Sequence, residues 1–426
     1  MTIPRLLLLA VLGPTAAAAQ SDPVAESRRE YRAAVQAYEA KDLPAFLEHA
    51  RRAQVLRPAH GGVTYALASA QALTGDTAAS LATLGHFAAL GYTADLAADS
   101  DFVALRKSPG YSDVSRWLNR NSAQLIASRI AFELPETDLL TEGIAHDSRE
   151  NVFYVGSVHH ARILRVTPEG TPSTFVAEMP DRWAPLGMRV DPDRRVLWVA
   201  ATALPQTSGY SPADSGRSGI LRFDLRTGRV TGRYEVPRDG AAHAIGDVVV
   251  SRGGDVYGSD SRSPVIYRLA SGSDSLERFV ESPLFLSAQG LDFDRDQRVL
   301  YVADYARGML RVDLASRRVS QVESADTVLA LGIDGLYFHQ GALIGIQNGV
   351  EPHRVTRFTI DRTGNRLTRQ HVLERAHPRY DDPTLGVLVA GELFYVGNAQ
   401  WERFGEDGRV TAPDSLARPM VLRLRL

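Results

Sequence analysis

Three polar residues that could bind a metal ion, Glu142, Gln289 and Asp334, each stand directly before a glycine. Carboxylate and amide oxygens are the ligands that calcium prefers in proteins. If the two carboxylates lie close together they repel each other, and a cation would relieve that repulsion. Otherwise one carboxyl group takes a raised pKa and becomes a group that can transfer a proton. The alternative is that these side chains only bond the backbone where strands end.

A second set of polar residues occupies related positions. Asp247 follows a glycine, and Asp304 and Asn398 end apolar strands, so we expect these three to contact a small-molecule substrate. His159 and His160 follow another such strand, and a histidine there would be a general base near neutral pH, as Asp334 would be. Three aromatic residues fall in neighbouring loops and would line an apolar pocket or pack between sheets: Trp183, Tyr305 and Trp401. The alternative for the histidines is exposure in loops.

A repeated sequence motif positions these residues. Six times between residues 142 and 398, a glycine opens an apolar strand, a turn follows, and a second apolar strand ends on a small or polar residue. The glycines are Gly143, Gly187, Gly246, Gly290, Gly335 and Gly386. Six β-rich repeats predict a mainly β fold, a six-bladed β-propeller over residues 126–426.

The propeller explains why the polar residues should meet. The two inner strands of a blade are antiparallel, so the start of the first and the end of the second lie at one rim of the central channel. Glycine suits the close backbone approach expected there. Residues 420–426 alternate strictly between apolar and polar, which indicates an edge strand. We expect the segment near Ile130 to pair with it and to close the ring.

The residues before the propeller have a different pattern. Residues 21–120 are alanine-rich and helical in character, and the pairs Tyr31/Tyr65 and Asp42/Asp76 are both 34 residues apart. This period resembles the tetratricopeptide repeat, and both aspartates are predicted to be helix N-caps. The helical domain would either cover one face of the propeller or bind a protein partner in a groove.

Composition limits the remaining possibilities. The chain has no cysteine, which excludes disulfides, zinc–thiolate sites and cysteine nucleophiles. Its net charge of −2 gives no support for nucleic-acid binding. Residues 1–19 combine Arg5, an apolar run and four alanines, which predicts a cleaved signal peptide and export to the periplasm or the medium. We expect no membrane-spanning segment in the mature protein.

At the glycine motifs the chain resembles the regucalcin and gluconolactonase family, calcium-dependent six-bladed propellers that hydrolyse lactones. Glu142-Gly143 is similar to the family's Glu-Gly-Pro motif, whose glutamate binds the metal. Gln289-Gly290 stands at its Pro-Asn-Gly-Leu motif, whose asparagine is a ligand. Asp334-Gly335 is similar to its Pro-Asp-Gly motif, whose aspartate binds the metal and serves as base. The resemblance implies a site for Ca²⁺, or another divalent cation, at Glu142, Gln289 and Asp334.

The chain also departs from the family. Ile144 replaces the motif's proline, Gln289 replaces the asparagine, and Gly246-Asp247 stands where the family has Asn-Asp. Two hypotheses therefore stay open. The chain is an exported, metal-assisted hydrolase of a lactone or ester at the channel mouth, or it is a non-catalytic propeller that binds a ligand or a protein with the help of its helical repeats.

Overall fold

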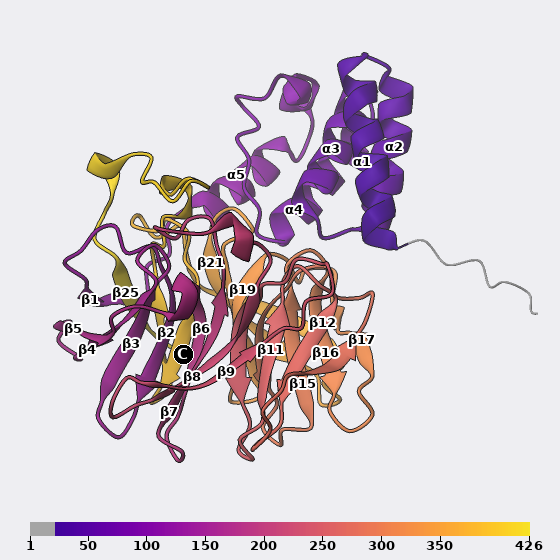
Figure 1. The fold of residues 1–426 in the computed structure, drawn as a ribbon. Helices are drawn as coiled ribbons and strands as arrows, with labels where there is room; N and C mark the ends of the chain where they lie inside the picture. Colours follow the sequence, from indigo (N-terminus) through magenta and orange to yellow (C-terminus); the bar gives the residue numbers. More distant parts are fainter. Residues whose placement is uncertain (1–21) are drawn as a thin grey trace, which may run out of the picture.

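The computed structural model describes residues 22–426, so the signal peptide expected at residues 1–19 lies outside the described residues. A small helical unit is followed by a six-bladed β-propeller (Figure 1). The predicted fold class is confirmed. Within residues 22–426, no helix has the length and apolar character needed to cross a bilayer.

The helical unit lies between residues 23 and 122. Its elements are α1 (Pro23–Glu39), α2 (Leu43–Leu56), α3 (Gly61–Leu73), α4 (Thr77–Ala89), a 3-10 segment (Ser100–Lys107) and α5 (Tyr111–Ser122). Asp42 caps α2 by accepting from the backbone N–H of Ala45 at 3.1 Å, and Asp76 caps α4 by accepting from Ala79 at 3.0 Å. Both residues are therefore the N-caps that the sequence predicts.

Six antiparallel sheets form the blades. Blade one is β2 (Thr141–Asp147), β3 (Val152–Ser157), β4 (Arg162–Val166) and β5 (Pro172–Val176). Blade two is β6 (Ala184–Asp191), β7 (Val196–Thr202), β8 (Ser218–Asp224) and β9 (Val230–Glu235). Blade three is β10 (Ile245–Val250), β11 (Val256–Asp260), β12 (Val265–Leu269) and β13 (Glu277–Glu281).

The last three blades follow the same order. Blade four is β14 (Ala288–Phe293), β15 (Val299–Asp304), β16 (Gly308–Asp313) and β17 (Val319–Gln321). Blade five is β19 (Ile333–His339), β20 (Ala342–Gln347), β21 (Arg354–Ile360) and β22 (Arg366–Arg375), with β18 (Glu323–Ser324) parallel to its outer edge. Blade six is β23 (Gly386–Val389), β24 (Glu392–Val396), β25 (Met420–Arg425) and β1 (Arg129–Glu133).

Blade six joins the two ends of the propeller. Strand β1 runs antiparallel to β25, with Ile130 opposite Leu422. The predicted ring closure is confirmed. Buried Glu374 anchors the chain just before β1, because it accepts from the backbone N–H groups of Ala127 and Ser128. The closure pairs the first and last strands of the propeller, with β1 as the outer strand of blade six.

Glycine is required where the inner strands crowd. A Cβ at Gly143 would overlap the carbonyl oxygen of Leu186 in blade two, and one at Gly290 would overlap the backbone of Asp334 in blade five. The apolar core lies between neighbouring blades. For example, the Tyr257 ring of blade three meets Phe293 of blade four edge-on, at 5.6 Å between centroids.

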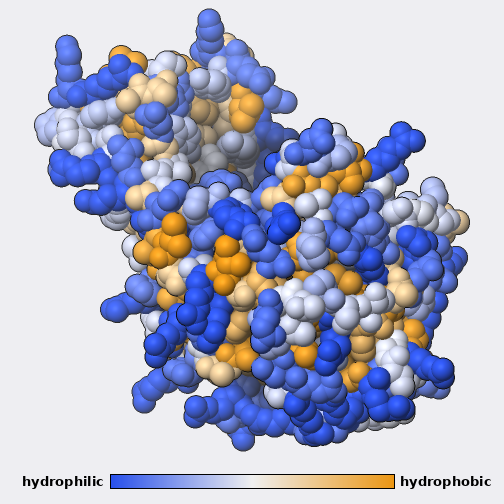
Figure 2. Space-filling view, turned by 90° about the vertical axis from the view of Figure 1, so that its left-hand side faces the viewer, coloured by the Kyte–Doolittle hydropathy of each residue, from blue (hydrophilic) through white to orange (hydrophobic). Residues whose placement is uncertain are grey.

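The helical unit packs on the rim where the inner strands begin. Arg57 donates to the carbonyl oxygen of Ala306, just after β15, at 2.7 Å. Arg354, buried at the start of β21, donates to the carbonyl oxygen of Gly91 at 3.1 Å. These contacts place the helices over blades four and five, to one side of the channel (Figure 1). On the face seen in Figure 2, hydrophobic side chains form only separate small groups.

Candidate functional site

The propeller opens at this rim into a cavity of about 200 Å³. Four of its lining residues are the polar residues Glu142 of β2, Asp247 of β10, Gln289 of β14 and Asp334 of β19. The inner strands of four different blades thus bring together the three predicted metal ligands and one predicted substrate contact. Trp401 also lines the cavity, as one of the three loop aromatics expected to do so.

Glu142 and Asp334 share a buried, electrostatically strained position. Burial raises the pKa of Glu142 well above its ordinary value, and the negative charge of Asp334 raises it further. Glu142 is only 8% exposed, and its Oε2 accepts from the indole N–H of Trp401 at 2.8 Å. Burial also raises the pKa of Asp334 to about 7, against the hydrogen bond from the Asn348 amide at 3.0 Å. Asp382 adds to both shifts.

Gln289 turns its amide oxygen toward the same cavity. Its Nε2 donates to the Ser287 hydroxyl at 3.0 Å, and its Oε1 lies 3.6 Å from the point where a Cβ on Gly246 would stand. Two carboxylates and one amide oxygen are a suitable donor set for a hard divalent cation. The carboxyl pair also fits, because a cation between the two groups would offset the burial and the nearby negative charges that raise their pKa values.

Asp247 is held differently from the other two carboxylates. Its Oδ1 accepts from the backbone N–H of Val248 at 2.8 Å, and its Oδ2 lies 3.5 Å from the guanidinium of Arg189. Burial still raises its pKa, although Arg189 opposes the shift. Deeper in the channel, burial raises the pKa of Asp292 to about 6. Arg189 thus compensates part of the negative charge below the cavity.

The other two predicted substrate contacts are engaged with the backbone. Asp304 is fully buried, and its carboxylate accepts from four backbone N–H groups at 2.7–3.1 Å, two just before β14 and two just after β15. Asn398 accepts from Met420 at 2.7 Å and donates to the carbonyl oxygen of Arg418 at 3.0 Å. Neither residue is among those that line the mouth cavity. Their polar atoms shape the loops of blades four and six.

The two histidines lie together but away from the mouth cavity. His160 Nε2 is 3.2 Å from the Asp138 carboxylate, and His159 Nδ1 bonds the carbonyl oxygen of Gln206 at 3.0 Å. Neither histidine lines the cavity. Of the other loop aromatics, Trp183 is buried against two arginines, whereas Tyr305 lines a separate pocket beneath the helical unit.

Sequence reasoning missed four charged residues that shape these sites: Asp138, Arg189, Arg262 and Asp382. Arg189 could have been found, because it stands two residues after Gly187 and alternation in a strand then points it into the channel. Arg262 and Asp382 lie in loops without a repeat pattern, so nothing in their spacing marked them.

A family model described as SMP-30/Gluconolactonase/LRE-like region matches residues 140–361, more than half of the chain. The chain belongs to this family. The match begins at the first inner strand and ends within blade five, so the helical unit lies outside it. The resemblance drawn from the three glycine motifs is therefore confirmed at the level of the family.

Solved structures similar to this SMP-30/gluconolactonase chain are distant. A gluconolactonase from Xanthomonas campestris is 16% identical and has a TM-score of 0.45, over 71% of this chain and 96% of that one. A calcium-binding regucalcin from Agrobacterium tumefaciens is 16% identical and has a TM-score of 0.48, over 70% and 93%. A luciferin-regenerating enzyme is 14% identical and has a TM-score of 0.48, over 68% and 93%. No curated protein matches the chain.

Proposed function

We propose that this propeller is a metal-assisted hydrolase of small lactones or related esters, acting at the mouth cavity. The observation that carries the proposal is the pair Glu142 and Asp334, two buried carboxyl groups that line one small cavity and that both have a raised pKa. Structural ion pairs normally join opposite charges. Two like charges held together without a basic group between them are typical of a metal or proton-transfer site.

Glu142, Gln289 and Asp334 would hold the cation, calcium or another divalent ion. When bound, it would supply a Lewis acid for the carbonyl oxygen of the substrate. Asp334 would accept a proton from water as the water oxygen bonds to the carbonyl carbon. The ring C–O bond then breaks, and the same proton passes to the ring oxygen, which leaves a hydroxy acid.

The surroundings favour a small substrate and an anionic product. A cavity of about 200 Å³ accommodates a compact ring and little more. Exposed Arg262 lines the cavity and would attract the carboxylate that ring opening creates. We also propose that the protein acts after export, since residues 1–19 have the composition of a signal peptide.

The test is hydrolysis of a panel of lactones and esters with calcium and with chelator. Glu142→Gln and Asp334→Asn keep the side-chain size and remove one charge each, so we expect both to lose cation-dependent turnover. Glu406→Gln and Asp296→Asn make the same changes at exposed positions outside the cavity and should keep it. Turnover that ignores the cation, or survives both cavity substitutions, would refute the proposal.

A second function has its own support. Between the helices and the propeller lies a larger pocket of about 710 Å³, and two amide positions of the family motifs are altered. A non-catalytic propeller that binds a ligand, or a protein through its helices, would account for both. Calcium-dependent stabilisation of the full chain without turnover on any substrate would favour this function over hydrolysis.

A further inference from the structure

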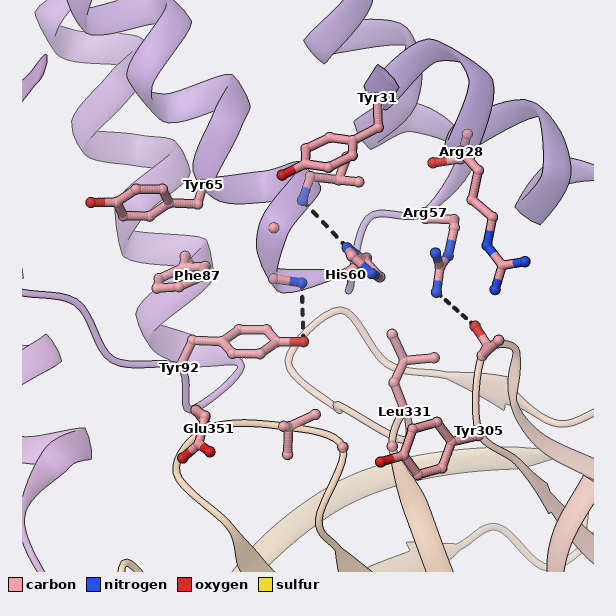
Figure 3. Close-up of a pocket in the computed structure, with 18 of the residues that line it drawn as sticks. Arg28, Tyr31, Arg57, His60, Tyr65, Phe87, Tyr92, Tyr305, Leu331 and Glu351 are labelled. Atoms are coloured by element: carbon pink, nitrogen blue, oxygen red, sulfur yellow. Dashed lines mark hydrogen bonds between the residues drawn. The ribbon is translucent and has the colours of Figure 1, made fainter. Parts of the chain in front are cut away.

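The pocket between the two parts of the chain lies apart from the mouth cavity. Its walls come from α1, α3 and the loop after α4 on one side, and from the propeller loops after β15 and β20 on the other. Its volume, about 710 Å³, lies within the range of ordinary small-molecule sites. Figure 3 shows side chains from both parts of the chain around it.

The pocket carries positive charge that the protein does not neutralise. Arg28 is exposed and, within residues 22–426, has no hydrogen-bonding or ion-pair partner. Arg57 uses one nitrogen to bond Ala306 at 2.7 Å. Burial, together with the nearby Arg28 charge, lowers the pKa of Arg57 to about 10. The two guanidinium groups stand side by side at one end of the pocket (Figure 3). An anion there would receive hydrogen bonds from both.

His60 adds a neutral donor beside them. Its Nδ1 accepts from the backbone N–H of Val63 at 3.3 Å, so the proton of the neutral ring stands on Nε2. Burial lowers the pKa of His60 to about 4, and the charges of Arg57 and Arg28 contribute. The ring is therefore uncharged at neutral pH, and its Nε2–H is available to an acceptor.

The other walls are aromatic and apolar. Phe87 and Tyr92 stack at 4.8 Å between centroids, and Leu331 and Val350 face them from the propeller loops. The Tyr92 hydroxyl is already used, since it donates to the carbonyl oxygen of Ala59 at 3.0 Å and accepts from Gly61. This part of the pocket therefore offers flat apolar surface and few free polar groups.

We propose that this pocket binds a small molecule with an aromatic body and one carboxylate group. The carboxylate would lie between Arg28 and Arg57 with the His60 Nε2–H beside it, and the ring would lie against Tyr92 and the propeller loops. The proposal does not depend on hydrolysis at the mouth, because none of these residues lines the mouth cavity. Glu351, the acidic residue at the propeller side of the pocket, pairs with His353 at 3.0 Å.

The experiment is calorimetric titration of the protein, with both its helical unit and its propeller, with 2-naphthoate and with its neutral isostere 2-naphthamide. We expect naphthoate to bind with one site per chain and at least about tenfold more tightly than the amide, because a charge-assisted hydrogen bond contributes more than a neutral one. Arg28→Gln should remove that preference, and Arg29→Gln, one residue further along the same helix, should leave it intact.

A second pair of variants separates binding from folding. Gly62 opens onto the pocket in α3, where a Cβ has room beside the Tyr31 hydroxyl at 3.4 Å, so Gly62→Leu should fill the space and abolish naphthoate binding. Gly85→Leu makes the same change in α4, away from the pocket, and should bind as the parent does. Equal binding of acid and amide, or undiminished binding to Gly62→Leu in a folded protein, would overturn the proposal.

A separate observation supports a transition-metal site on blade one. One ligand atom from each of Asp138, His159 and His160 lies within 4.8 Å of the others. His160 Nε2 is buried and lies 3.2 Å from the Asp138 carboxylate, without the alignment of a hydrogen bond. That distance matches the edge of a tetrahedron around an ion with bonds of about 2.0 Å. His159 bonds Gln206 through Nδ1 at 3.0 Å, the usual outer contact that leaves Nε2 free for a metal.

We infer that these three side chains bind a zinc-type divalent ion. Titration of the mature protein with zinc, after calcium has saturated the mouth, should show one further equivalent and a raised melting temperature. His160→Asn should remove both effects, and His371→Gln, a change at an exposed histidine of β22, should keep them. Zinc that stabilises His160→Asn as much as the parent would contradict the inference.

Discussion

The mouth cavity and the pocket beneath the helices lie on the same face of the propeller but have opposite character. The mouth is small and acidic, with Glu142 and Asp334 held against their mutual repulsion. The other pocket is more than three times larger, and it is basic and aromatic. The first is built entirely from inner strands and rim loops of the propeller, whereas the second exists only because a helical unit is docked on the rim.

The two sites therefore depend on different parts of the chain. The acidic mouth belongs to the region that matches the SMP-30/gluconolactonase family, and its candidate ligands lie on inner strands. The basic pocket depends on helices outside that match and on docking contacts such as Arg57 with Ala306. Substitutions at the mouth should therefore act mainly on cation binding, and substitutions at the docking contacts should act mainly on ligand binding.

The largest effect is expected from the mouth carboxylates. Asp334→Asn should weaken calcium binding by at least about 100-fold, since even outer-shell changes cost 10- to 100-fold. The same substitution should raise the melting temperature in chelator, because it removes a buried negative charge that repels Glu142. Differential scanning calorimetry with calcium and with chelator checks both signs. A variant that is destabilised in chelator would show that the carboxylates do not repel each other.

The stability of the cation-free protein should depend on pH through the acidic mouth. The pKa of Asp334 is about 7 in the folded chain and 3.8 ordinarily, so the folded state binds the extra proton between these values. The contribution of Asp334 to stability should be full below about pH 4 and should be lost as the pH rises through about 7. Urea unfolding in chelator at several pH values measures this slope. Asp334→Asn should flatten it, and Asp296→Asn should not; a slope that survives in Asp334→Asn would assign it to other groups.

The fold could be predicted because the repeat is visible in single residues. Each glycine before an inner strand and each strand end recurs, and the alternation at residues 420–426 locates the closing strand. The rim position of the three candidate metal ligands followed from the same register, because a residue directly before a repeat glycine must stand at the rim. Glu142, Gln289 and Asp334 therefore lie where the sequence placed them.

The partners of Asp304 and Asn398 could not be predicted, because a strand-end position does not show whether a carboxylate faces the channel or its own loop. Backbone N–H groups of the following turn and of the segment before β14 satisfy Asp304 in the structure. The basic pocket was equally hidden. Arg28 and Arg57 lie on helical surfaces with no repeat relation to the propeller, and only docking brings them to Tyr305.

Loosening the docking contact should affect the basic pocket alone. Gly91 has a φ of +91°, and an added Cβ would collide with the Arg354 guanidinium. Gly91→Ala should therefore destabilise the docked helices by about 1–3 kcal/mol and should weaken naphthoate binding several-fold. Gly75→Ala, at another left-handed glycine with open space around it, controls for backbone strain. Calorimetry should find calcium affinity unchanged in both variants; a loss in Gly91→Ala would mean that the two regions are not independent.

The smallest effect concerns a hydrogen-bonded link between the mouth cavity and the basic pocket. The Tyr305 hydroxyl, at the edge of the basic pocket, donates to Asn348 Oδ1 at 3.0 Å, and Asn348 donates to Asp334 at 3.0 Å. Tyr305→Phe removes the first of these bonds and leaves the ring, so calcium affinity should fall by roughly threefold to tenfold, as expected for one hydrogen bond.

Calcium titrations with and without saturating naphthoate show whether this link couples calcium binding at the mouth to naphthoate binding in the basic pocket. In the parent, the effect of naphthoate on calcium affinity must equal the effect of calcium on naphthoate affinity. Tyr305→Phe should reduce that coupling, and Tyr210→Phe, a change in the loop between β7 and β8, should not. If Tyr305→Phe leaves calcium affinity unchanged, the mouth and the basic pocket bind their ligands independently although they lie on one face of the propeller. The affinity of each site must then be explained from its own residues.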